Sequence, residues 1–133
     1  MPVPRVILVD DNPEFMERAR TLLVQDFNVI ASFEDGYSLL NAWSTLKPDI
    51  VVSDISMPPI SGLDLARTLA EQGYSGPIVF LTIHNEQDFV SAALAAGASG
   101  YVLKSHMTSD LLPALNAVLS GKKFLSTSIS HSH

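Results

Sequence analysis

The chain has 133 residues, 47% of them hydrophobic, and its fourteen acidic and eight basic residues give a formal net charge of −6. This length suits one domain of ordinary size with a buried core and leaves no room for a second. The negative charge disfavours nucleic acid and anionic membranes as direct partners of this segment, and favours a protein or a cation. Cysteine is absent, which excludes a disulfide framework and a thiolate metal site.

The sequence carries no signal for entering or crossing a membrane. No apolar run approaches the roughly 20 residues that a membrane span needs. The first residues, MPVPRVILVDD, lack the charged start, the long apolar centre and the small-residue cleavage site of a signal peptide. Together with the absence of cysteine, these features lead us to expect a soluble, cytoplasmic protein without a membrane partner.

Five short apolar runs predict the strands of a sheet. The runs lack polar alternation, which is typical of strands covered on both faces, as in a parallel sheet. They span residues 6–9, 29–33, 50–52, 78–81 and 101–103.

Apolar residues at helical spacing follow each of these runs. The first three helices are predicted from Phe15, Ala19, Leu22 and Leu23, from Leu39, Leu40, Trp43 and Leu46, and from Leu65, Leu69 and Ala70. The fourth, over residues 86–96, is rich in alanine, and the fifth carries Leu111, Leu115, Val118 and Leu119. Because strands and helices alternate with short connections, we predict an α/β fold in which one five-stranded parallel sheet has helices on both faces.

Capping residues mark the ends of these helices. The predicted starts are Asn12 before Pro13, Ser61 three residues before Asp64, and Asn85 three residues before Asp88. The predicted ends are Gly73, Gly97 and Gly121, and Pro113 is expected only in the first turn of a helix. We therefore expect one domain over residues 1–121, followed by an interdomain linker or an appended tail over residues 122–133, where His131 and His133 are not expected to bind metal.

Polar residues end four of the five predicted strands. Asp10 and Asp11 follow the first strand, Asp54 the third, Thr82 the fourth and Lys104 the fifth. In an open parallel sheet, functional side chains gather beyond the carboxyl ends of the strands. Three carboxylates, a hydroxyl and an ammonium are therefore expected to lie together.

This set of residues suits phosphoryl chemistry at a metal. Three clustered carboxylates repel one another and raise at least one pKa unless a cation compensates. Oxygen ligands without histidine or cysteine favour Mg²⁺, with Mn²⁺ as a substitute. A carboxylate can attack phosphorus when the charge on the transferring group is neutralised, which the metal and Lys104 would do. Asp54 is the best-placed nucleophile.

Taken one at a time, the same residues have ordinary structural explanations. Asp11 and Asn12 are suitable helix caps, Thr82 is a β-branched residue at a strand end, and Lys104 could be a solvated surface cation. Their joint occurrence at the same end of different strands has no such explanation and favours a functional site.

Four segments, VILVDDNPEF, PDIVVSDISMPPISGLDLA, PIVFLTIH and GASGYVLKS, carry a family resemblance. In this order and spacing they resemble the response-regulator receiver domains of two-component signalling. The resemblance implies a flavodoxin-like doubly wound sheet with the strand order 2-1-3-4-5 and five helices. It also implies a phosphoacceptor switch rather than an enzyme, one that phosphorylates itself from phosphodonors and slowly loses the group.

The resemblance implies a role for each residue near the metal. Asp54 would accept the phosphoryl group. Asp11 would bind the metal directly and Asp10 would bind it through water. Asp54 and the backbone carbonyl of Ser56 would complete the protein ligands.

The resemblance further implies a switching mechanism. Thr82 and Lys104 would contact the phosphoryl oxygens, and Tyr101 would rotate inward behind Thr82. Phosphorylation biases a pre-existing equilibrium only through contacts that differ between the two states. The readout surface would be the fourth helix, the fifth strand and the fifth helix. A half-buried strand aromatic without a switching role is the alternative for Tyr101.

Three residues stand at positions that would tune the lifetime of an aspartyl phosphate. Ser56 and His84 would shape the access of water, although a solvated loop serine and histidine remain the alternative. Ile83 stands where many family members have a small residue and is expected to restrict access to Asp54. Ser105 replaces a proline that many receivers have in a cis bond. This leaves the isomer of the Lys104–Ser105 bond open, because a non-proline cis bond costs about 3 kcal/mol.

The run GASGYVLKS followed by AVLSGKKFLS resembles receivers that precede a LuxR/NarL-type helix-turn-helix DNA-binding domain. The resemblance implies three protein partners, namely a sensor histidine kinase, an output DNA-binding domain in a longer protein, and a second copy in a homodimer. We expect this chain to be the regulatory fragment of a transcription factor.

Three other functions share parts of the pattern. A flavin-binding module needs a hydroxyl- and glycine-rich loop after the first strand, whereas this loop is DDNPEF. A phosphatase with an aspartyl-phosphate intermediate would have its nucleophile on the first strand and a second aspartate two residues later, where this chain has Asn12. A receiver that has lost its site and serves only as a scaffold is disfavoured by the intact aspartates, Thr82 and Lys104.

Overall fold

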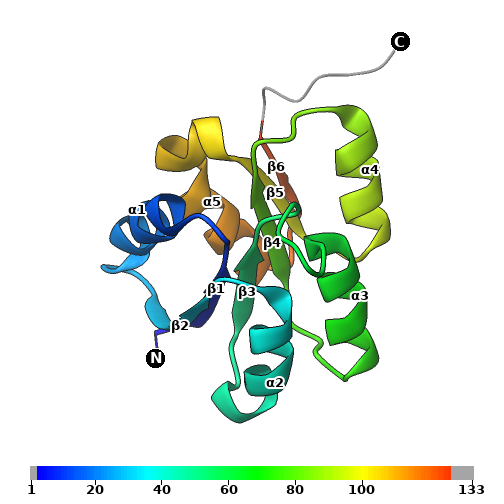
Figure 1. Cartoon of the computed structure of the whole chain (residues 1–133). Coiled ribbons are helices and arrows are strands. Elements are labelled where there is room, and N and C mark those ends of the chain that lie inside the picture. Colours follow the sequence, from blue (N-terminus) through cyan, green and yellow to red (C-terminus); the bar gives the residue numbers. More distant parts are fainter. Residues whose placement is uncertain (1–2, 127–133) are drawn as a thin grey trace.

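The computed structural model describes residues 3–126, in which strands and helices alternate (Figure 1). The strands are β1 (Arg5–Val9), β2 (Asn28–Phe33), β3 (Ile50–Ser53), β4 (Ile78–Thr82), β5 (Gly100–Leu103) and β6 (Phe124–Leu125). The helices are α1 (Pro13–Leu23), α2 (Gly36–Leu46), α3 (Gly62–Glu71), α4 (Gln87–Ala95) and α5 (Met107–Leu119), and a 3₁₀ turn, η1 (Lys104–His106), precedes α5.

The strands form one parallel sheet in the order β2-β1-β3-β4-β5-β6. The first five have the predicted order, which confirms the flavodoxin-like α/β fold. The prediction of a five-stranded sheet was wrong, because β6 pairs with the outer edge of β5. A strand of two residues is too short to produce a readable apolar pattern, so the sequence did not reveal it.

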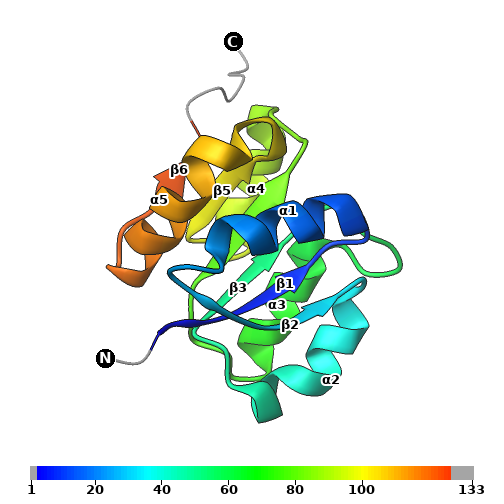
Figure 2. The ribbon, with the colours of Figure 1, turned by 90° about the vertical axis from the view of Figure 1, so that its left-hand side faces the viewer.

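Helices cover both faces of the sheet. Figures 1 and 2 show α1 and α5 on one side and α2, α3 and α4 on the other. Neighbouring residues of β1 point to opposite faces, so Ile7 packs with α2 and α3 while Leu8 packs with α1 and α5, and both are buried. Burial on both sides explains why the strands read as continuous apolar runs. None of the helices in residues 3–126 has the length and apolar character that crossing a membrane requires.

Most of the predicted helix ends are confirmed. The Asn12 side chain accepts hydrogen bonds from the first turn of α1, and the Ser61 side chain caps α3 through the Asp64 amide. Just beyond α3, α4 and α5, the three predicted glycines have positive φ angles of 100°, 101° and 81°. Only glycine adopts this conformation without a steric cost.

Two helix predictions were wrong. The cap position of α4 is Glu86 rather than Asn85, and Glu86 makes no side-chain capping bond. Pro113 lies in the interior of α5, which begins six residues earlier at Met107. Proline removes one helical hydrogen bond at this position. Met107 and Leu111 are both buried, and their packing against the sheet keeps the first turns helical in spite of that loss.

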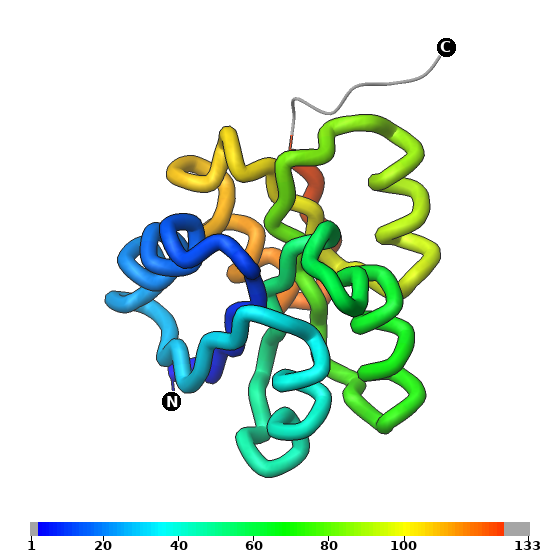
Figure 3. The backbone as a smooth tube through the Cα atoms, in the orientation of Figure 1, coloured from blue at the N-terminus to red at the C-terminus, as the bar shows by residue number. Residues whose placement is uncertain are grey.

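The chain after α5 returns to the sheet instead of leaving it. Figure 3 shows this segment turning back at the end of α5 and running beside β5. Ser126, the last described residue, is 3% exposed. Residues 122–126 therefore pack on the domain, although they fall in the range where a linker or tail was predicted. His131, His133 and the rest of residues 127–133 lie outside the described residues.

Candidate functional site

Three side chains from three strand ends form the centre of the site. Asp10 follows β1, Asp54 follows β3 and Lys104 follows β5. The Lys104 ammonium donates to Asp10 Oδ2 at 2.8 Å and to Asp54 Oδ2 at 3.0 Å. All three residues are buried. Because two carboxylates share one ammonium away from bulk water, the group has a net negative charge.

Backbone amides hold the remaining oxygens of the two buried carboxylates. The Asn12 amide donates to Asp10 Oδ1 at 2.8 Å, and the Ile55 amide donates to Asp54 Oδ1 at 2.7 Å. Both carboxylates are therefore fixed in orientation. Each oxygen of Asp54 accepts one hydrogen bond and keeps a further lone pair for an incoming group.

Asp11 adds a third carboxylate at the solvent side of the group. One oxygen each from Asp10, Asp11 and Asp54 lie within 4.8 Å of one another, and Asp11 is exposed whereas the other two are buried. Three hard oxygen ligands at this separation suit Mg²⁺, which is bound through few carboxylates and keeps several waters. The exposed side of the cluster leaves room for those waters.

The pKa values of Asp10 and Lys104 are both raised, that of Asp10 through burial and that of Lys104 through its hydrogen bonds. Burial raises the pKa of Asp10 above its usual value, and the hydrogen bonds from Lys104 and the Asn12 amide offset only part of this rise. Burial alone would lower the pKa of Lys104, but its hydrogen bonds to Asp10 and Asp54 outweigh burial and raise it. The cluster holds three carboxylates and one ammonium, so a second cation would stabilise it.

Thr82 and Tyr101 lie together behind the site. Thr82 ends β4 and is fully buried, and its Oγ1 accepts a hydrogen bond from the His84 amide at 3.3 Å. Tyr101 on β5 is also fully buried, and its hydroxyl donates to the backbone carbonyl of His84 at 2.7 Å. Burial raises the pKa of Tyr101, with Glu86 and Asp54 adding to the effect. The aromatic ring is thus turned inward and tied to the loop between β4 and α4.

The three residues expected to tune phosphoryl lifetime form a rim. Ser56 Oγ and His84 Nε2 lie 2.7 Å apart, so the loops after β3 and β4 are joined by a hydrogen bond. The His84 ring stacks on Phe89 of α4, with centroids 4.0 Å apart and planes 8° apart. Ile83 is 69% exposed and points to solvent.

Two residues of the site were not identified from the sequence. The Phe15 ring lies against Lys104, whose Nζ is 4.3 Å from the ring centroid, which is a cation–π distance. Gly62 begins α3 against the backbone of Asp54 and Ile55, and a Cβ at Gly62 would overlap the Asp54 carbonyl and lie 2.9 Å from the Ile55 Cα. Both residues lie in segments that carry the family resemblance. A single aromatic residue or glycine in a sequence does not indicate which residues it contacts in the fold.

The peptide bond that the sequence left open is resolved. The cis bond among the described residues is Pro58–Pro59, in the loop after β3. Lys104–Ser105 is therefore trans, and Ser105 follows the 3₁₀ conformation of η1.

Comparison with known proteins agrees with this geometry. The model of the response regulator receiver domain family matches residues 6–116. The chain is 32% identical over 116 residues to the DNA-binding transcriptional activator EvgA of Escherichia coli (strain K12), covering 86% of this chain and 57% of EvgA. It is 32% identical over 127 residues to the nitrate/nitrite response regulator protein NarL of the same organism, covering 94% of this chain and 59% of NarL. The chain thus spans a little over half the length of these relatives.

Solved structures agree in both fold and sequence. A LuxR-family two-component response regulator from Aurantimonas sp. SI85-9A1 superposes with a TM-score of 0.91 at 32% identity, covering 96% of this chain and 93% of that one. The isolated receiver domain of RcsB from Salmonella enterica serovar Typhimurium, determined with the phosphomimetic BeF₃⁻, gives a TM-score of 0.89 at 33% identity, covering 96% of each chain. The chain belongs to the response regulator receiver domain family, and it is a receiver of the LuxR-family kind, which serves phosphorylation-controlled two-component signalling.

Proposed function

We propose that Asp54 is the phosphoacceptor of this receiver. The observation that carries the proposal is the pairing of Asp54 Oδ2 with the Lys104 ammonium, at 3.0 Å, inside a cluster that also contains Asp10 and Asp11. Asp54 follows β3, which lies between β1, the strand that Asp10 follows, and β4, which ends in Thr82. Among the three carboxylates it is therefore the one on the strand beside Thr82.

A divalent cation fits the same residues. Asp10, Asp11, Asp54 and the backbone carbonyl of Ser56 would hold Mg²⁺, and Mn²⁺ would substitute for it. The fit rests on oxygen ligands within 4.8 Å of one another and on the excess of three carboxylates over one ammonium. When bound, the ion would supply positive charge against the oxygens of the transferring phosphoryl group.

The chemical step is a transfer of the phosphoryl group to a carboxylate oxygen. An oxygen of Asp54 forms a bond to phosphorus while the bond from phosphorus to the donor atom breaks, and the electron pair leaves with the donor. For a phosphohistidine donor, the departing imidazole nitrogen then takes a proton from solvent. Lys104 moves from the Asp54 carboxylate to a phosphoryl oxygen and keeps its contact with an anionic group throughout.

The residues around Asp54 would then respond to the phosphoryl group and set its lifetime. Thr82 would hydrogen-bond a phosphoryl oxygen, and Tyr101 would hold the inward position behind it. Ser56, Ile83 and His84 would set the lifetime of the adduct, and the Ser56–His84 hydrogen bond joins the loop that follows Asp54 to the loop after β4. The chain would thus phosphorylate itself from a donor and lose the group slowly.

The wider role follows from the relatives. EvgA is named a DNA-binding transcriptional activator, and this chain matches 57% of it. A structure of RcsB is described as two dimers bound to two parallel DNAs. We infer that this chain is the cytoplasmic regulatory part of a longer protein, that a sensor histidine kinase phosphorylates it, and that it controls a DNA-binding domain through a homodimer.

The test is intact-mass analysis after incubation with acetyl phosphate and Mg²⁺. A base-labile adduct with the mass of one phosphoryl group is expected on the wild type and not on Asp54→Asn. Asp26→Asn, which changes an exposed carboxylate in the loop after α1, is the matched control and should form the adduct normally. No adduct on the wild type would overturn the proposal and favour a scaffold that has lost phosphotransfer. An adduct that survives Asp54→Asn would overturn it by placing the phosphoryl group on another residue.

A further inference from the structure

The last described segment is built into the sheet beside the switch residues. After α5, Gly121 has a φ of 81° and the Lys122 amide donates to the Ala117 carbonyl at 2.9 Å, which reverses the chain. Residues 124–125 then pair in parallel with residues 100–101 of β5. Since α5 connects two parallel neighbouring strands, β5, α5 and β6 form one more strand–helix–strand unit of the fold.

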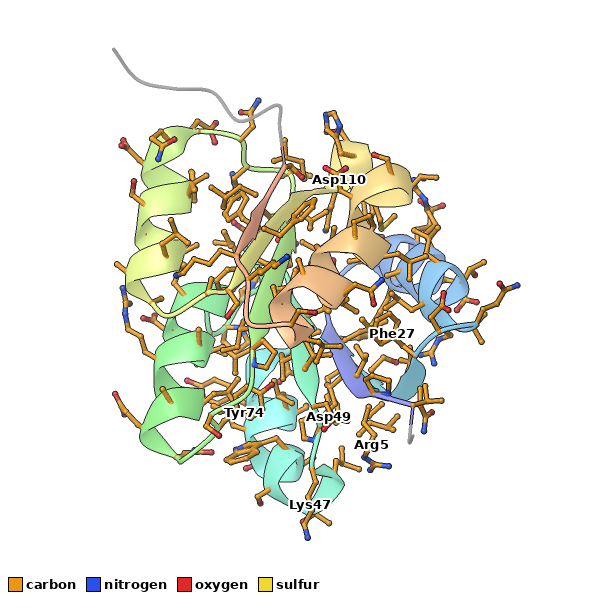
Figure 4. The ribbon with its side chains drawn as sticks, turned by 180° about the vertical axis from the view of Figure 1, so that it is seen from behind. Arg5, Phe27, Lys47, Asp49, Tyr74 and Asp110 are labelled. Atoms are coloured by element: carbon orange, nitrogen blue, oxygen red, sulfur yellow. The ribbon has the colours of Figure 1, made fainter. Side chains whose placement is uncertain are left out.

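Ser126 fixes the end of this segment by three hydrogen bonds. Its amide donates to the Tyr101 carbonyl at 2.9 Å, and its Oγ accepts from the Leu103 amide at 3.0 Å. The same Oγ donates to Asp110 Oδ2 on α5 at 2.8 Å. Asp110 lies on α5 near the end of β6, as Figure 4 shows. A serine hydroxyl that both accepts and donates in a buried position is a specific attachment, because replacing it leaves the Leu103 amide without an acceptor.

The attachment points are the same residues that contact the candidate site. The Tyr101 carbonyl accepts a hydrogen bond from the Ser126 amide, and the Tyr101 hydroxyl donates one to the His84 carbonyl. Leu103, which donates to Ser126, directly precedes Lys104, and Lys104 binds Asp10 and Asp54. The contact with Ser126 is therefore made by the residue next to Lys104, whose ammonium would contact the phosphoryl oxygens.

Little apolar burial holds the segment in place. Leu125 is 44% exposed and Phe124 is only partly buried. A two-residue edge strand with so little apolar burial gains little free energy from packing, and a small bias is enough to shift its pairing with β5. The segment is thus positioned by specific hydrogen bonds but stabilised by little apolar burial. A contact with these two properties can be switched.

We propose that residues 122–126 are a docking strand whose pairing with β5 is coupled to the state of Asp54, and that phosphorylation favours the docked form. The inference rests on the proposed phosphoacceptor function. The direction follows from the conformation itself, since β6 is docked while the Tyr101 ring is turned inward, which is the position proposed for it after phosphorylation. Coupling is reciprocal, so a docked strand also favours phosphorylation of Asp54.

The direct test is hydrogen exchange of single backbone amides, followed by NMR on the 133-residue chain with Mg²⁺, with and without excess acetyl phosphate. Phosphorylation is expected to raise the protection of the Phe124 and Ser126 amides about tenfold, the scale of one hydrogen bond. The Asn28 and Asp49 amides, which donate to Pro4 and Arg5 at the other end of the sheet, report general stabilisation. Figure 4 shows Arg5 and Asp49 at the end opposite Asp110. The protection of β6 must rise relative to these two amides.

Variants test the reciprocal direction. Ser126→Ala is expected to lower the protection of the Leu103 amide and to lower the phosphorylated fraction at a limiting acetyl phosphate concentration about threefold or more, within the usual range of coupling. Ser109→Ala is the matched control, because Ser109 Oγ also donates to Asp110, at Oδ1, but does not touch β6. The control should behave as the wild type in both measurements.

Intact-mass analysis of the same samples distinguishes a failure of the docking inference from a failure of the phosphoacceptor proposal. If the adduct forms on Asp54 and the relative protection of Phe124 and Ser126 does not change, the docking inference is overturned and the phosphoacceptor proposal stands. Equal phosphorylation of Ser126→Ala and the wild type also overturns the inference. If no adduct forms, the phosphoacceptor proposal fails and the docking inference fails with it.

Discussion

The Tyr101 hydroxyl donates a hydrogen bond to the backbone carbonyl of His84, over 2.7 Å, and so joins β5 to the loop after β4. The ring is fully buried. Because protein cores are closely packed, we expect no space for a water molecule that could replace the hydroxyl. Within residues 3–126, it is the one hydrogen bond between the Tyr101 side chain and the loop that follows Thr82.

Tyr101→Phe is expected to lower the free energy of unfolding by about 1–2 kcal/mol, because it leaves the His84 carbonyl without its donor. Urea unfolding measures the change. Tyr37→Phe, at an exposed position at the start of α2, is the control and should change stability by less than about 0.5 kcal/mol. Equal effects of the two substitutions would show that the Tyr101 hydroxyl makes no structural contribution.

Lys104→Met is expected to lower the free energy of unfolding by about 3 kcal/mol at neutral pH in the presence of EDTA, because two buried carboxylates lose their shared cation. Without Lys104, only the Asn12 amide is left to offset the burial that raises the pKa of Asp10. A raised pKa in the folded state means that folding favours the protonated carboxyl. The stability of the variant should therefore recover as pH falls from 7 towards the ordinary aspartate value of about 4.

Denaturant unfolding at several pH values checks this behaviour. Lys122→Met, which removes an exposed lysine after α5, is the matched control and should show neither the loss nor the recovery. A Lys104→Met protein as stable as the wild type at pH 7 would mean that the ammonium does not hold the carboxylates together.

Asp11→Asn is expected to have opposite effects with and without metal. In EDTA it removes one of three mutually repelling carboxylates and should stabilise the fold by about 0.5–1 kcal/mol. With millimolar Mg²⁺ the wild type should gain stability through binding, while the variant should gain little. Thermal unfolding with and without Mg²⁺ measures both, and Asp26→Asn should respond to Mg²⁺ as the wild type does. An equal Mg²⁺ response in Asp11→Asn would exclude Asp11 as a ligand.

Gly62→Ala is expected to damage the site through the backbone. The new Cβ would collide with the Asp54 carbonyl and approach the Ile55 Cα, and backbone cannot move aside as a side-chain end can. A loss of about 2 kcal/mol or more is expected, with a lower rate of phosphorylation. Gly36→Ala is a matched control at the start of α2, where the Cβ would lie 2.6 Å from a methyl group of Ile60 that can rotate away. Equal losses in stability and rate for the two variants would contradict this explanation.

Much of the fold was predictable because the decisive signals are local. The strands are buried on both faces, so each appears as an apolar run, and Asp10, Asp54 and Lys104 each follow such a run directly. If the strands are parallel, their carboxyl ends lie at the same edge of the sheet, and these three side chains lie close together there. The meeting of Lys104 with both carboxylates was therefore accessible from the sequence.

The remaining features depend on contacts that a sequence pattern does not encode. The docking of β6 comes from the Ser126 hydroxyl and Asp110, sixteen residues apart, and two residues of strand leave no period to read. Pro113 stays inside α5 because the buried stripe from Met107 onward outweighs one missing hydrogen bond. Gly62 owes its role to the path of a different segment, the backbone of Asp54. In each case tertiary packing overrides the local preference.

The central claim is that the phosphoryl group is carried by Asp54 and by no other carboxylate of the cluster. Reduction of the phosphorylated chain with borohydride converts an aspartyl phosphate into homoserine, and peptide mass spectrometry then locates the changed residue. The account predicts homoserine at position 54, dependent on Mg²⁺ and on acetyl phosphate, with Asp10 and Asp11 unchanged. Homoserine at position 10 or 11, or none in a chain shown to be folded, would contradict it.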